Sequence, residues 1–152
     1  MATRPDFVLY DRHGRLAAIV EVKAKRGTSS RWAAEFRRNL LAHDAFQQAP
    51  FFLLITPDKV YLWKETSRPG GAGSSPIPPD YELDAKSLFR RYLERAGLNP
   101  EDVSGQAFEL IVMSWLGDLI LQLPDVTQQP ELEDSGLPQA AKDGRVAYPA
   151  AA

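Results

Sequence analysis

Two acidic residues and a lysine near the start of the chain have the types and spacing for chemistry on a negatively charged substrate. Glu21 and Lys23 alternate with Val22 in an otherwise apolar run, so in a strand their side chains share one face. A turn at His13-Gly14 would pair this strand with the preceding one and set Asp6 opposite Glu21, pointing the same way. Because a slip of one residue would turn Asp6 to the other face, the convergence depends on the turn type.

The charge of this trio favours a bound cation. Two carboxylates and one ammonium sum to −1, and an unpaired charge in a poorly solvated place is costly. A hard divalent ion with oxygen ligands, such as Mg²⁺ or Mn²⁺, would remove the excess. Such an ion activates water and polarises a phosphoryl oxygen, while Lys23 orients the water or stabilises developing negative charge. The pattern suits metal-assisted phosphodiester hydrolysis, although Glu21 and Lys23 could instead form a structural ion pair.

Hairpins alternating with helices would position these residues. The order indicates an α/β (α+β) fold with a mixed central β-sheet flanked by helices. A capping cluster at Thr28-Ser29-Ser30 opens the first helix, whose apolar stripe is Trp32, Phe36 and Leu40. Strands are expected over 6–10, 16–24, 51–55 and 60–63, and helices over 31–46, 85–96 and 105–123, with a further short helix near 136–142.

Three parts of one domain are expected along the chain. Residues 1–65 hold the core with the acidic residues and the lysine. Residues 66–81 are rich in Pro, Gly and Ser, which is typical of a flexible loop. Residues 82–152 form a helical C-terminal portion that completes or extends the same domain.

Pro5-Asp6, followed on the next strand by Glu21-Val22-Lys23, resembles the PD-(D/E)XK nuclease superfamily. In that family a hairpin carries the aspartate and the Glu-X-Lys, and a helix and a further strand follow. The strand pair within 51–64 is also similar to the N-terminal nuclease domain of type I restriction-enzyme motor subunits. The resemblance implies a restriction-endonuclease-like core with a helical C-terminal extension. It also implies metal ligands at Asp6, Glu21 and the Val22 backbone carbonyl, with Asp6, Glu21 and Lys23 as the catalytic set.

One departure from the family concerns its first helix, which usually precedes the aspartate strand and often carries another acidic residue. Only four residues stand before Pro5 in this sequence, so we expect the fold to do without that helix. The apolar helix expected over 105–123 could take its place and bring Glu109 to the metal. Alternatively, Glu109 caps or pairs structurally near the start of its helix, where the dipole favours an acid.

A group of basic residues follows the proposed site. As a phosphate-contacting surface they would bind DNA, with RNA not excluded, in a salt-dependent way. As the alternative, they form an ordinary solvated helix face. The group comprises Lys25, Arg26, Arg31, Arg37 and Arg38.

The composition of the chain excludes several classes of protein. The 152-residue chain has no cysteine, which excludes disulfide scaffolds and thiolate metal sites. Its N-terminus lacks the apolar core of a signal peptide, and the longest apolar stretch, 108–123, is interrupted by charges, so we expect a cytoplasmic protein without a membrane span. Residues 1–68 carry +5 and residues 69–152 carry −7. These halves can attract each other, or the basic half can face a polyanion.

Two functions are compatible with these features. The first is a Mg²⁺-dependent endonuclease acting on DNA, which as a single site cuts one strand and would need a homodimer, or successive nicks, to cut both. The second is a catalytically inactive module of the same fold that binds DNA or a protein partner. Fold alone does not decide between them.

Overall fold

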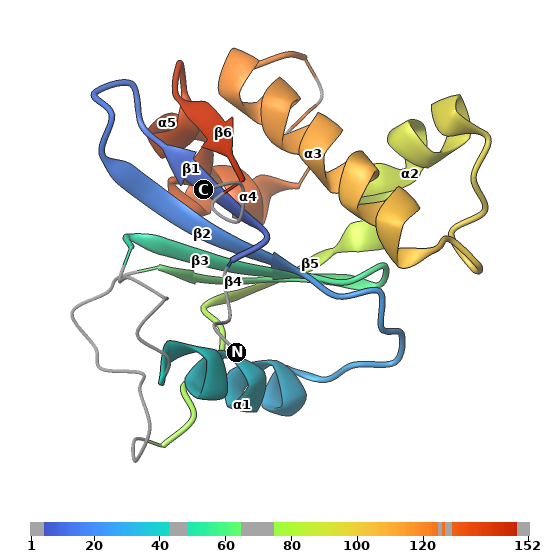
Figure 1. Ribbon diagram of the computed structural model, residues 1–152, viewed down its shortest axis with the longest axis horizontal. Helices are drawn as coiled ribbons and strands as arrows, with labels where there is room; N and C mark the ends of the chain where they lie inside the picture. The colour runs from blue at the N-terminus through green and yellow to red at the C-terminus, as the bar shows by residue number, and fades with distance from the viewer. Residues whose placement is uncertain (1–4, 43–48, 65–74, 125, 127–128, 149–152) are drawn as a thin grey trace.

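A computed structural model describes residues 5–42, 49–64, 75–124, 126 and 129–148 of the chain. Figure 1 shows a β-sheet with helices on both sides. The elements run in the order β1 (Phe7–Tyr10), β2 (Leu16–Val22), α1 (Ser30–Leu41), β3 (Phe51–Ile55), β4 (Lys59–Lys64), β5 (Tyr81–Asp84), α2 (Ala85–Ala96), α3 (Gly105–Leu121), α4 (Pro130–Ser135), α5 (Leu137–Ala141) and β6 (Arg145–Ala147).

The six strands form one mixed sheet in the order β5-β4-β3-β2-β1-β6. Strands β2 and β3 are parallel, joined by the crossover through α1, and the other neighbours are antiparallel. The predicted α+β class with a mixed, helix-flanked sheet is therefore confirmed.

The hairpin of β1 and β2 has the predicted register. Phe7 pairs with Val20 and Val8 with Ile19, and a bulge between Leu9 and Tyr10 shifts the pairing only at the turn end. Continuing the ladder by one residue from Phe7 sets Asp6 opposite Glu21. The turn chemistry thus fixes which face each side chain takes.

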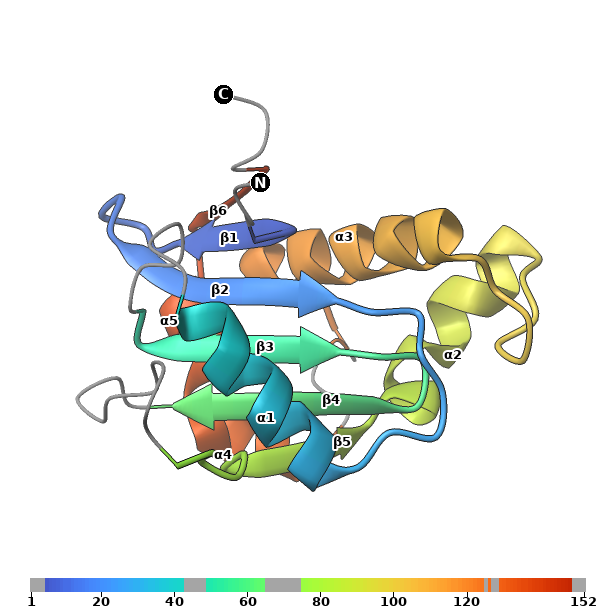
Figure 2. The ribbon, with the colours of Figure 1, turned by 60° about the horizontal axis from the view of Figure 1, so that its bottom comes forward.

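Helices cover the two faces of the sheet unequally. Helix α1 crosses one face alone, while α2 to α5 lie on the other (Figures 1 and 2). The predicted stripe of Trp32, Phe36 and Leu40 packs α1 against that face. On the opposite face α3 buries Phe108 and Trp115. Both faces of β2 are covered, which explains its almost uninterrupted apolar sequence.

The helix ends follow the local sequence. Ser29 caps α1 by accepting the Trp32 N–H, but α1 ends at Leu41 rather than at the predicted residue 46, and residues 43–48 lie outside the described residues. Helix α2 has the predicted bounds, with Asp84 at its N-cap and Gly97 in the left-handed conformation at its C-cap.

Two short strands were not predicted. Strand β5 begins at Tyr81, at the end of the expected loop 66–81, of which residues 66–74 lie outside the described residues. Strand β6 pairs with β1 from within the portion expected to be helical. A side chain at Gly144 would collide with the Tyr10 carbonyl oxygen, so glycine permits β6 to approach β1. The C-terminal portion therefore supplies sheet as well as helices.

Among the described residues, none of the helices combines the length and apolar character needed to cross a bilayer.

Candidate functional site

The three predicted residues meet at the end of the sheet where β2 stops. Asp6 immediately precedes β1, Glu21 is the penultimate residue of β2, and Lys23 follows its last residue. The end of α3 that carries Glu109 lies at the same end of the sheet (Figure 2). Four charged side chains from separate parts of the sequence are thereby brought into electrostatic range of one another.

Asp6 joins the two strands of the hairpin through its side chain. Its Oδ2 accepts the Val22 N–H at 2.8 Å, where the β1–β2 ladder would otherwise end. In an antiparallel pair the N–H and C=O of one residue point to the same neighbouring strand. The Val22 carbonyl therefore points to the side of β2 that carries Asp6, which agrees with the ligand role implied for it.

Glu21 is the most perturbed acid of the cluster. Its side chain is buried at 3% exposure. Burial raises the pKa of Glu21 to about 9, helped by the hydrogen bond that the protonated carboxyl donates to Asp6 and by the charges of Asp6 and Glu109, with Lys23 opposing. At neutral pH and without metal, Glu21 is therefore protonated and does not form an ion pair with Lys23.

Lys23 is held by its backbone and by an aromatic ring. Its N–H donates to the Ile55 carbonyl at 2.9 Å, so the pairing with β3 extends one residue beyond β2. The exposed ammonium lies over the Phe36 ring of α1, 5.3 Å from the ring centroid. Its positive charge partly offsets the rise in the pKa of Glu21 and of Glu109 that burial causes.

Glu109 reaches the cluster from α3. The helix starts beside the chain that follows Lys23, since a Cβ on Gly105 would lie 3.8 Å from the Ala24 Cβ. Burial raises the pKa of Glu109, the Asp6 charge raises it further, and Lys23 opposes both. Glu109 is therefore within electrostatic range of Asp6 and Lys23, while its role at a metal stays a prediction. Sequence alone could not establish this proximity, because α3 follows β2 by more than eighty residues.

The predicted basic residues separate into different environments. Lys25 lies over the Trp32 ring at 5.6 Å, and Arg26 donates from Nη2 to the Pro100 carbonyl at 2.6 Å. Arg31 is exposed and lies 3.9 Å from Glu35 along α1. Arg38 is half-buried and is hydrogen-bonded to its neighbour Asn39.

Arg37 does not lie on the exposed surface that was expected for it. It is 7% exposed, and its guanidinium lies between the Phe52 and Trp63 rings of the sheet, 5.5 and 5.3 Å from their centroids. It falls one turn after Ala33, on the face of α1 that packs on β3 and β4. Its planar cation and aliphatic stem suit such an aromatic slot.

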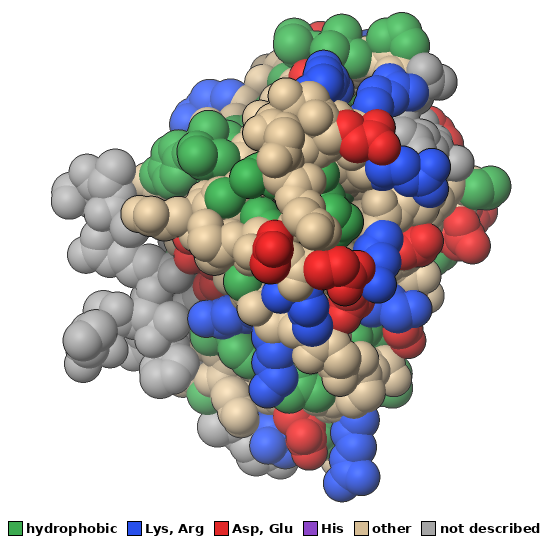
Figure 3. All heavy atoms as spheres, turned by 90° about the vertical axis from the view of Figure 1, so that its right-hand side faces the viewer, with side chains coloured by type: hydrophobic (Ala, Val, Ile, Leu, Met, Phe, Trp, Pro, Cys, Tyr) green, Lys and Arg blue, Asp and Glu red, His purple; other side chains and the backbone are tan. Residues whose placement is uncertain are grey.

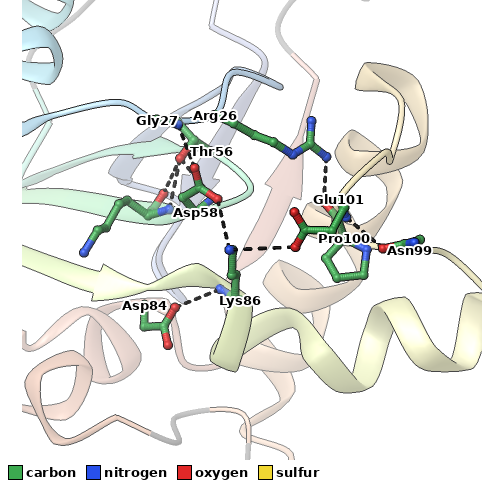
Figure 4. A network of polar contacts seen from close by, with 10 residues as sticks. Arg26, Gly27, Thr56, Asp58, Asp84, Lys86, Asn99, Pro100 and Glu101 are labelled. Carbon is green, nitrogen blue, oxygen red and sulfur yellow. Dashed lines mark hydrogen bonds and ion pairs between the residues drawn. The ribbon is translucent and has the colours of Figure 1, made fainter.

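A polar network not anticipated from the sequence ties together the loops beside the site (Figure 4). Asp58, in the β3–β4 turn, accepts the Gly27 N–H at 2.8 Å and lies 3.8 Å from the Lys86 ammonium. Lys86 is also 3.8 Å from Glu101, next to the residue whose carbonyl Arg26 contacts. Figure 3 shows basic and acidic side chains interspersed over this end of the molecule. The network holds the loop that follows Lys23.

The donor set of the site fits a hard divalent ion. Asp6, Glu21 and Glu109 supply oxygen atoms and an excess of negative charge over the single Lys23. Within the described part of the chain, no group of three His, Asp or Glu side chains is already arranged to hold a metal. The Glu21 carboxyl group is instead protonated at neutral pH, and a cation would have to displace that proton.

Comparison of the chain with protein-family models, with curated proteins and with solved structures found no match. The resemblance to the PD-(D/E)XK nucleases therefore stays a prediction. The function is argued below from the site itself.

Proposed function

We propose that this protein is a metal-dependent phosphodiesterase of the PD-(D/E)XK type, which hydrolyses DNA. The observation that carries the proposal is the buried Glu21 carboxyl group, which is hydrogen-bonded to Asp6 and lies within electrostatic range of Glu109 and Lys23. An ionised Glu21 carboxylate, buried beside Asp6, would be costly for the fold, and a bound cation would remove that cost.

Each residue has a defined task in this proposal. Bound Mg²⁺ or Mn²⁺ supplies Lewis acidity and an activated water. Asp6, Glu21 and the Val22 carbonyl would hold the ion, and Glu109 would offer a further carboxylate from α3. Lys23, exposed just beyond the last residue of β2, stabilises the negative charge that develops on the phosphoryl group.

The topology supports the same assignment. The Asp–hairpin–Glu-X-Lys segment is followed by α1 and by the parallel strand β3, as the family resemblance requires. Helix α3 places the acidic residue Glu109 within electrostatic range of Asp6 and Lys23, which is compatible with a further carboxylate near the metal.

Metal titration and DNA cleavage test the proposal. We expect Mn²⁺ or Mg²⁺ to raise the melting temperature. At a metal concentration 100 times the dissociation constant, the free energy of unfolding should increase by about 2.7 kcal/mol. Glu21→Ala should lose both the metal effect and cleavage, whereas Lys23→Ala should keep the metal effect and lose cleavage. Cleavage by Lys23→Ala at the parent rate in excess Mg²⁺ would show that the lysine is not catalytic.

A second candidate function is an inactive module of the same fold that binds DNA or a protein partner. It is favoured by the engagement of Asp6, which already accepts the Val22 N–H and a bond from Glu21. In that case Asp6 is a structural residue. Asp6→Asn would then destabilise the protein strongly, and neither Mn²⁺ nor Mg²⁺ would change its melting temperature.

A further inference from the structure

Two lysines of the segment after β2 lie over aromatic rings of α1. Lys23 lies over Phe36, with 5.3 Å from ammonium to ring centroid, and Lys25 lies over Trp32 at 5.6 Å. The two rings contact each other at 5.3 Å, inclined by 37°. The two lysines, separated by Ala24, thus lie over two aromatic rings that are one helical turn apart on α1.

The rings stand on a rigid support. Trp32 and Phe36 are half-buried and pack against the core between α1 and the sheet. Ala33, between them in sequence, is fully buried, so the helix lies close to the strands. The faces of the rings are therefore fixed relative to β2, and a cation that lies over one of them is fixed as well.

Lys23 has few other contacts that could hold its ammonium. Within the part of the chain that the structure describes, no carboxylate lies within ion-pair distance of it. Its carboxylate neighbours act on it only through longer-range charge. A lysine with an exposed head group otherwise samples many rotamers, and a cation over an aromatic face is attracted by the ring quadrupole.

We propose that Phe36 is a positioning residue for Lys23: its ring holds the ammonium beside the acidic cluster, in the place where it acts on substrate. The proposal rests on the proposed function for its catalytic consequence, but the contact itself can be tested without activity. Trp32 holds Lys25 in the same way, farther from the cluster, and provides a matched control.

The contact is measured by NMR on the full-length, metal-free protein. Ring currents should shift the Lys23 side-chain methylene protons upfield, and Phe36→Leu should abolish that shift while Phe36→Tyr keeps it. Trp32→Leu should remove the corresponding shift of Lys25 and leave that of Lys23. An unchanged Lys23 signal in Phe36→Leu would overturn the proposal. If Phe36→Leu does not fold, the test uses Lys23→Met, which should shift the resonances of the Phe36 ring. Unchanged Phe36 ring resonances in Lys23→Met would also overturn the proposal.

Kinetics then test the positioning role. We expect Phe36→Leu to lower kcat on DNA roughly two- to five-fold, because the contact is weak and exposed, with KM and the Mn²⁺ midpoint unchanged and with rescue by Phe36→Tyr. Loss of the NMR shift without any change in kcat would refute that role. If the parent protein cleaves no DNA, the proposed function fails, while the NMR result still decides whether Phe36 holds Lys23.

Discussion

At the scale of single residues, the protonated Glu21 makes the metal-free protein sensitive to pH. Its pKa of about 9 lies above the ordinary 4.5, so the folded state keeps a proton that the unfolded chain loses. Stability should therefore fall as pH rises from about 4.5 to about 9, because the unfolded state is the one that ionises. The raised pKa of Glu109 acts in the same direction.

Glu21→Gln should reduce this dependence and stabilise the metal-free protein at pH 8, since the amide keeps a hydrogen-bond donor for Asp6 without a charge. The measurement is the free energy of unfolding in urea at pH 5 and pH 8. Glu82→Gln, the same change at an exposed position of β5, is the control. A Glu21→Gln protein with the parent's pH slope would show that Glu21 is not the protonated group.

Glu109 offers a separate test of the metal site. Mn²⁺ must displace the proton held by Glu21, so its apparent affinity should increase with pH. Glu109→Gln should weaken Mn²⁺ binding about ten-fold if its carboxylate is a ligand or a close neighbour of the ion. Isothermal titration at pH 7 measures the affinity, and circular dichroism checks the fold. An unchanged affinity would make Glu109 a structural residue of α3.

How far the site could be predicted depends on how local its geometry is. Strand alternation and the type of one turn predict that the side chains of Asp6, Glu21 and Lys23 share one face. Both rules depend only on residues close in sequence. Arg37 escaped prediction because a charged residue on a helix is ordinarily exposed. The signal was its position one turn after the buried Ala33, opposite the Phe52 and Trp63 rings.

At the scale of elements, the unpredicted strands are the short ones. Strand β5 has four residues and β6 has three, too few to show the alternation that identifies a strand. Their pairing is decided by the neighbouring strands, with β4 and β1 providing the free edges. The longer strands, the bounds of α2 and the start of α3 were predictable, because hydrophobic periodicity and helix-capping residues appear in the local sequence.

Gly144 controls whether β6 can join the sheet. A Cβ there would meet the Tyr10 carbonyl oxygen, and backbone cannot move aside as a flexible side chain can. Gly144→Ala should therefore destabilise the protein by about 1–3 kcal/mol, measured by urea unfolding. Gly117→Ala, in α3 with open space around its Cβ, should be neutral or stabilising by up to about 1 kcal/mol. Equal stability of the two variants would contradict the close approach of β6 and β1.

At the scale of the whole molecule, the two oppositely charged halves are built into each other. The acidic second half supplies β5 and β6, on opposite edges of the sheet, and covers one entire face with α2 to α5. Lys86 of α2 and Asp58 of the β3–β4 turn form an ion pair between the halves, with the cation on the acidic half. Because the two halves share one sheet, their opposite net charges lie close together, and the charge asymmetry supplies no separate evidence for a polyanion.

This arrangement predicts that the first half cannot fold alone. A chain ending at residue 81 keeps the Asp6, Glu21 and Lys23 cluster but loses the helix that buries Phe108 and Trp115 against the sheet. One face of β1 to β4 would then be exposed, at a cost of roughly 25 cal/mol per Å² of apolar surface, and the sheet would lose both edge strands. We expect a poorly dispersed amide NMR spectrum, a gradual urea transition and no Mn²⁺ binding. A dispersed spectrum with a cooperative transition would show instead that residues 1–81 are a domain by themselves and that α3, with Glu109, is an addition to a complete nuclease-like core.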